Sequence, residues 1–125
     1  MKHVGAVKQM TVTTVAALAI SAVAFAAGPS IHVTPGTVHA AHRVQLSGNA
    51  GGCPTGDRVM LLSRAFSPRH EFAGVPAVFA RVRSNAHYGH SVLIPATTHA
   101  GHYSISGRCG GGNFGVTAHL RVLSP

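Results

Sequence analysis

The run FGVTAHLRV, residues 114–122, is the clearest structural signal in the chain. Apolar residues alternate with polar or small ones, so one side of an extended chain would carry Phe114, Val116, Ala118, Leu120 and Val122. An α-helix would instead repeat its apolar positions at every third or fourth residue. The run therefore predicts a β-strand with one buried face.

Six further short runs share this extended character, and residues typical of turns separate them. They cover residues 30–33, 43–47, 58–62, 76–82, 91–94 and 102–106. We expect residues 66–74 to be irregular and residues 84–89 to form a hairpin turn. The chain after residue 26 shows no helical repeat of apolar residues. Seven short strands in about 100 residues predict one all-β domain, an antiparallel β-sandwich.

The N-terminal segment, residues 1–26, has the features of a cleavable signal peptide. Lys2 and Lys8 precede an uncharged apolar stretch, and small residues flank Phe25 at the expected cleavage site. An uncleaved membrane anchor is the alternative, although the stretch is short for a span of roughly 20 residues. We therefore expect export, with no membrane span after cleavage, and a secreted or cell-wall-associated domain formed by residues 27–125.

The expected domain is strongly basic. The whole chain carries 10 Lys plus Arg against 2 acidic residues, and residues 27–125 keep eight arginines against Asp57 and Glu71. Such a charge attracts polyanions, so an anionic cell-envelope polymer is an expected partner, with another extracellular protein as the alternative. Arg81 and Arg83 alternate along a predicted strand and are the candidate anion-binding residues. Nucleic acid is a disfavoured partner, because no recognition motif is visible and aromatic residues are sparse.

The scarcity of carboxylates argues against catalysis. A catalytic triad needs an orienting carboxylate, and only Asp57 and Glu71 are available in the expected domain. The glycines 110–112 lead into a predicted strand, so we interpret them as a hairpin turn and not as a phosphate-binding loop. We therefore expect a domain that is not an enzyme and that carries no cofactor.

Histidine is the unusual residue type, with 10 in the chain. Three pairs have the spacing H-x-x-H, namely His39 and His42, His87 and His90, and His99 and His102. Neutral imidazole binds Zn and Cu, so these six residues are candidate metal ligands. The alternative is that the pairs are solvent-exposed histidines in turns.

The only two cysteines, Cys53 and Cys109, both lie in the expected domain. An even pair in an oxidising compartment predicts a disulfide. A catalytic thiol would need a positioned base, and a metal site would need further ligands at suitable spacing. Nothing near either cysteine supplies these, so we expect the disulfide.

Several motifs resemble small secreted actinobacterial immunoglobulin-like domain proteins. The resemblance rests on residues 31–35 followed by 44–48, on the run RCGGGNFG at 108–115, and on the partner cysteine in 52–54. It implies an exported immunoglobulin-like β-sandwich of about seven strands and no particular activity. More distantly, the opening strands resemble the neocarzinostatin-type apoproteins, which carry enediyne chromophores. That family uses two disulfides, whereas this chain has cysteines for one.

The sequence therefore predicts a secreted non-enzymatic immunoglobulin-like domain that binds a partner or forms part of the cell envelope. Two alternatives stay open. The resemblance to neocarzinostatin-type apoproteins implies a carrier of a small ligand, and the histidine pairs indicate a metal-binding protein.

Overall fold

The computed structural model describes residues 28–125. The predicted signal peptide, residues 1–26, lies outside the described residues. Within residues 28–125, no helix has both the length and the apolar character needed to cross a membrane.

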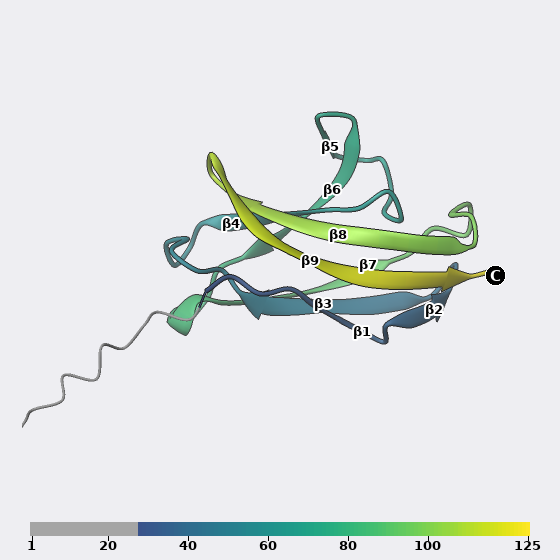
Figure 1. The fold of residues 1–125 in the computed structure, drawn as a ribbon, viewed down its shortest axis with the longest axis horizontal. Helices are drawn as coiled ribbons and strands as arrows, with labels where there is room; N and C mark the ends of the chain where they lie inside the picture. The colour runs from purple at the N-terminus through teal and green to yellow at the C-terminus, as the bar shows by residue number, and fades with distance from the viewer. Residues whose placement is uncertain (1–27) are drawn as a thin grey trace, which may run out of the picture.

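Two β-sheets pack face to face (Figure 1). The smaller sheet has the strand order β1 (His32–Thr34), β3 (Arg43–Asn49) and β7 (His87–Leu93). The larger sheet has the order β2 (Thr37–His39), β9 (Gly112–Leu123), β8 (Gly101–Cys109), β4 (Arg58–Leu62), β6 (Val75–Arg81) and β5 (Glu71–Phe72). A single 3-10 turn, η1 (Ser84–Ala86), connects β6 to β7.

The strand order is immunoglobulin-like. The opening segment pairs first with β3 in one sheet, as β1, and then with β9 in the other, as β2. Strands β4, β8 and β9 adjoin in the larger sheet, while β3 and β7 adjoin in the smaller one, as in immunoglobulin sandwiches. All pairings are antiparallel except that of β2 with β9, which is parallel. The predicted all-β sandwich is confirmed.

Two strands were not predicted from the sequence, and one turn was predicted in the wrong place. Strands β2 and β5 have three and two residues, too few for an alternation to be recognised. The hairpin turn predicted at 84–89 is wrong, because β7 already begins at His87. Asn85 and Ala86 both adopt positive φ, which reverses the chain within η1 and leaves the following residues free to extend.

Val116 is not a core residue, although the alternation in 114–122 predicted it. Its side chain is 38% exposed. Gly115 has a φ of 74°, and the pairing of β8 with β9 shifts in register next to it: Ser106 pairs with Thr117 but Arg108 pairs with Asn113. This bulge inserts extra residues into β9 and turns Val116 out of the alternation.

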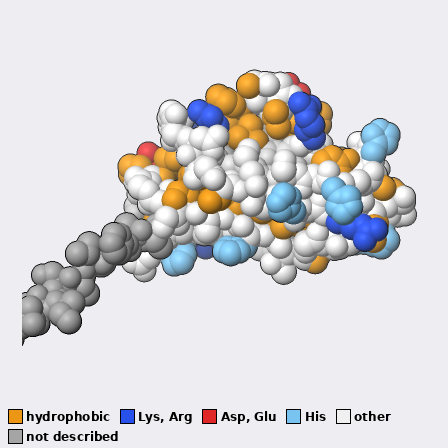
Figure 2. Space-filling model, viewed as in Figure 1, with side chains coloured by type: hydrophobic (Ala, Val, Ile, Leu, Met, Phe, Trp, Pro, Cys, Tyr) orange, Lys and Arg blue, Asp and Glu red, His pale blue; other side chains and the backbone are white. Residues whose placement is uncertain are grey.

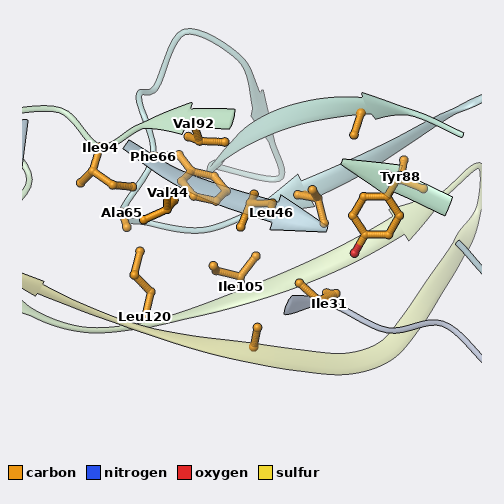
Figure 3. Packing of buried hydrophobic residues seen from close by; sticks show 14 of the residues in the cluster. Ile31, Val44, Leu46, Ala65, Phe66, Tyr88, Val92, Ile94, Ile105 and Leu120 are labelled. Atoms are coloured by element: carbon orange, nitrogen blue, oxygen red, sulfur yellow. The ribbon is translucent and has the colours of Figure 1, made fainter. Parts of the chain in front are cut away.

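The core lies between the two sheets, and side chains of both sheets meet there (Figure 3). Its largest fully buried side chains are Leu46, Leu61, Ile94, Ile105 and Leu120. The loop after β4 contributes Ala65 and Phe66. Alternation places Val44 and Leu46 of β3, Val59 and Leu61 of β4, and Ile105 of β8 in the core, while Leu62 at the end of β4 is buried as well.

Two aromatic rings close one end of this core, and each lies over a glycine. Tyr88 on β7 reaches across Gly48 on β3 and donates its hydroxyl proton to the carbonyl oxygen of Ser30, at 2.7 Å. Phe114 packs in the same way against Gly107, where a Cβ atom would lie 2.5 Å from the ring. Burial raises the pKa of Tyr88 from 10.0 to about 12, because the phenolate would lose its hydration.

The predicted disulfide joins Cys53 to Cys109, with Cα atoms 5.9 Å apart. Cys53 lies in the loop between β3 and β4, and Cys109 ends β8. The bond therefore ties a loop that follows the smaller sheet to a central strand of the larger one.

Candidate anion-binding face

Of the two predicted anion-binding arginines, Arg81 lies within a strand and Arg83 lies just beyond its end. Arg81 ends β6 and is exposed, and Val82 after it is buried. Arg83 lies beyond the strand, where its backbone N–H donates to the carbonyl oxygen of His87 at 2.7 Å, just before η1. Arg81 therefore belongs to the outer face of the larger sheet, and Arg83, whose backbone is still extended (φ −95°, ψ 178°), follows the buried Val82 just beyond the strand.

The structure also places Arg58 beside Arg81. In the antiparallel pairing of β4 with β6 the two residues stand directly opposite, so their side chains share the outer face. The Arg58 guanidinium lies 5.0 Å from the centre of the Phe79 ring. The Arg81 Nη1 donates to the carbonyl oxygen of Gly56 at 3.3 Å. Like charges directly opposite each other on neighbouring strands are unfavourable, so this pair costs folding stability.

A third arginine joins this face from the other side of β4. Arg108 on β8 pairs with Met60 of β4, and Met60 pairs with Phe79 of β6. The Arg108 guanidinium lies 4.9 Å from the centre of the Phe72 ring, and its Nη2 donates to the carbonyl oxygen of Gly111 at 3.3 Å. The Nε of Arg108 is buried and has no hydrogen-bond partner.

We name this surface the arginine face and define it by Arg58, Arg81 and Arg108 together with Met60, Phe72 and Phe79. Its residues come from four consecutive strands of the larger sheet, in the order β8, β4, β6 and β5. The next positions on this side of the strands are Leu62 and Ala77, which are buried, and Ser106, which is half-buried. Both acidic residues of the described chain adjoin the arginine face in sequence, since Asp57 precedes Arg58 and Glu71 precedes Phe72.

Two of the guanidinium groups lie over the flat faces of aromatic rings. A guanidinium stacked on a ring keeps N–H donors around its edge, and these donors match the paired oxygens of a carboxylate or phosphate. Phe72 is itself 40% exposed, so apolar surface adjoins the cations. Figure 2 shows hydrophobic side chains gathered over the upper part of the molecule, around β5 and β6, with basic side chains on either side. The arrangement suits an anion that also offers apolar surface.

The candidate metal ligands are separated by the fold, with one exception. His87 and His90 lie three residues apart on β7, where successive side chains point to opposite faces. His99 precedes β8 while His102 lies within it. His39 and His42 flank the turn after β2, and their ring centres are 6.1 Å apart. Among the described residues, the one group of three potential ligand atoms is Cys53, Asp57 and Cys109, whose sulfurs are already joined in the disulfide.

A groove opens between β6 and β7 and shares Phe79 with the arginine face. It has a volume of about 490 Å³, and Val78, Phe79 and Leu93 give it apolar walls. His70 and His90 also line it, and the His70 ring lies edge-on to Phe79 with ring centres 5.7 Å apart. Leu93 is 47% exposed, which is unusual for so large an apolar side chain. This groove was not predicted from the sequence, because it depends on how the loop before β6 and the two strands pack in space.

No protein-family model and no curated protein matches the sequence. Solved structures of similar fold do match. One is the alkylpurine DNA glycosylase AlkC of Pseudomonas fluorescens, bound to DNA containing an abasic site analog, with 17% identity and a TM-score of 0.53. The match covers 76% of this chain, which spans only 29% of the length of the glycosylase chain. At this identity the likeness shows the fold alone.

Macromomycin is also similar, with 12% identity, a TM-score of 0.49, and coverage of 78% of this chain and 100% of that one. It is an apoprotein of the neocarzinostatin family, the more distant of the two resemblances in the sequence. A chain from a structure on T cell activation by the superantigen toxic shock syndrome toxin-1 has 12% identity and a TM-score of 0.38, covering 78% of this chain and 100% of that one. Neither likeness is close enough to show a function for this chain.

The prediction that the chain is not an enzyme is contradicted by the glycosylase. A region with this fold forms part of that enzyme, so the fold occurs in catalytic proteins. The prediction rested on the small number of carboxylates, and that scarcity weighs only against reactions that need a carboxylate pair or triad. The resemblance to secreted actinobacterial immunoglobulin-like proteins stays a prediction.

Proposed function

We propose that residues 27–125 form an exported binding domain whose arginine face binds an anionic polymer of the cell envelope. The observation that carries the proposal is the placement of Arg58 directly opposite Arg81, with Arg108 one strand away. An anion lying across these residues would relieve the repulsion between them. The opposed pair, which is unfavourable in the free domain, would then favour the complex.

A polymer fits this surface better than a small anion. Arg58 and Arg81 are exposed opposite each other on the sheet face, and Arg108 is half-buried one strand away. An isolated contact between exposed charges contributes little, about 0.2–1 kcal/mol. Repeated carboxylates or phosphates on one chain would engage several arginines at once and release several counterions. Another extracellular protein with an acidic surface is the alternative partner.

Retention on a heparin column tests the proposal. We expect the triple variant R58A/R81A/R108A to elute at clearly lower salt than the wild-type protein, because three contacts of about 0.5–1 kcal/mol together change affinity about 10–100-fold. The matched control is R43A/R64A/R121A, which removes the same charge from exposed arginines elsewhere. Equal losses of retention in both variants would show that net charge alone causes binding, and the arginine face would be rejected.

A small-ligand carrier is the second candidate, and the groove between β6 and β7 is the observation that favours it. Its apolar walls and its two histidines suit an amphiphilic molecule with an acidic group. If the protein is a carrier, native mass spectrometry of material purified from culture medium will show an added mass. L93D, which places a charge in the apolar wall, should then release that mass. A wild-type protein that carries no added mass contradicts the carrier function.

A further inference from the structure

The turn after β2 brings together two histidines that have no part in the arginine face. His39 ends β2, and the backbone N–H of His42 donates to the carbonyl oxygen of His39 at 3.2 Å. This β-turn places both side chains on the same side, with their ring planes inclined at 58°. Both residues are exposed. They lie at the end of the sandwich where β2 adjoins the C-terminal end of β9, away from the β8–β9 hairpin (Figure 1).

The hydrogen bonds of the two rings leave the same nitrogen free in each. The Nδ1 of His39 lies 2.6 Å from the carbonyl oxygen of Ser124, and the Nδ1 of His42 lies 3.3 Å from the carbonyl oxygen of Ala40. A carbonyl oxygen only accepts, so Nδ1 carries the proton in both rings and Nε2 keeps its lone pair. Metal-binding histidines show this arrangement, in which one ring N–H donates to a backbone carbonyl and the other nitrogen binds the ion.

The backbone that carries the pair is held by both sheets. Ala40 is fully buried, and its N–H donates to the carbonyl oxygen of Leu123 at 2.9 Å. The N–H of Ala41 donates to the carbonyl oxygen of Ile94 at 2.8 Å. These two bonds fix the turn to β9 on one side and to the end of β7 on the other. The separation of the two histidines along the backbone is therefore set by the fold.

The distance between the rings fits one shared ion. A nitrogen ligand lies about 2.0 Å from the metal, which puts each ring centre about 3 Å from the ion. Two rings bound on opposite sides of one ion would then have centres about 6 Å apart, and the observed separation is 6.1 Å. Rotation of the exposed side chains brings the rings closer, so that the two nitrogen–metal bonds then meet at an angle below 180°.

We propose that His39 and His42 bind one late divalent transition-metal ion through their Nε2 atoms, with water completing the coordination. Neutral imidazole suits Cu(II), Ni(II) and Zn(II), and Cu(II) forms the tightest complex with a given set of ligands. The site therefore takes Cu(II) in preference to Zn(II). The pairs His87 with His90 and His99 with His102 have no such geometry.

Calorimetric titration with CuCl₂ tests the site. We expect the wild-type protein to bind one ion with its highest affinity, and we expect H39A and H42A each to weaken that binding at least tenfold. ZnCl₂ should bind at the same site more weakly. The matched control is H87A/H90A, which removes two histidines of the same spacing and should keep the affinity of the wild type. Circular dichroism verifies that each variant is folded.

A second measurement locates the ion directly. Cu(II) is paramagnetic, so a substoichiometric addition should broaden the NMR signals of His39, His42 and Ser124 before that of His87, at the far end of β7. The proposal is overturned if the wild type binds no Cu(II), if H39A and H42A bind it as tightly as the wild type, or if H87A/H90A loses as much affinity as they do.

Discussion

The double variant C53A/C109A should lose about 4 kcal/mol of the free energy of unfolding, because it frees a loop in the unfolded chain. The bonded cysteines are 56 residues apart, so the disulfide removes a large loop-closure entropy from the unfolded state. A domain of this size has a net stability of only about 5–15 kcal/mol. The loss will be visible as a lower midpoint in urea unfolding.

Reduction of the wild-type protein supplies the control for this prediction. Reduced wild type and C53A/C109A should unfold at similar urea concentrations, since both lack the cross-link. Cys109 ends the strand that carries Arg108, so we also expect weaker heparin retention once the end of β8 is released. A variant that is as stable as the oxidised wild type would contradict the role given to the disulfide.

The variant G48A should lose about 3 kcal/mol or more, a cost that combines overpacking with a broken buried hydrogen bond. A Cβ atom at this position would lie 2.0 Å from the carbonyl oxygen of Ser30 and 2.8 Å from the Tyr88 hydroxyl oxygen. The contact with Ser30 cannot be relieved by a side-chain rotation, because the Ser30 atoms belong to the backbone. We therefore expect the opening segment to shift away from β3, with loss of the bond between Tyr88 and Ser30.

Titration of Tyr88 distinguishes this mechanism from general unfolding. Burial holds its pKa at about 12 in the wild type, so the neutral phenol stabilises the fold below pH 10 and this contribution is lost between pH 10 and 12. In folded G48A the pKa should fall toward 10, because the ring gains water. The control is G36A, whose added Cβ atom would meet no atom within 4 Å. A G48A protein as stable as G36A would contradict the packing described for Tyr88.

Much of the fold follows from local sequence pattern. Strand β4 was predicted with its observed ends, and β9 was found from its alternation, because one face of each packs on the core. The errors have local causes as well. The bulge at Gly115 interrupts the alternation, and the positive φ of Asn85 and Ala86 shortens the turn before β7. Such conformations depend on neighbouring strands, so spacing alone does not reveal them.

The candidate sites were harder to predict, because they depend on register between distant strands. Arg81 was identified, but its partner Arg58 is 23 residues earlier in the chain and meets it only through the pairing of β4 with β6. Arg108 arrives from β8 for the same reason. The three histidine pairs look alike in sequence, and only the turn after β2 brings one pair together. The sequence pattern identified arginine and histidine as the candidate residue types. The pairing of distant strands and the turn after β2 determine which of these residues lie together.

An NMR titration of the arginine Nε–H signals with polyphosphate will show whether the arginine face binds an anionic polymer. We predict that the signals of Arg58, Arg81 and Arg108 shift first and together, and that those of Arg43 and Arg121 shift later and less. Equal shifts at all arginines, or shifts confined to residues outside the arginine face, would contradict the claim.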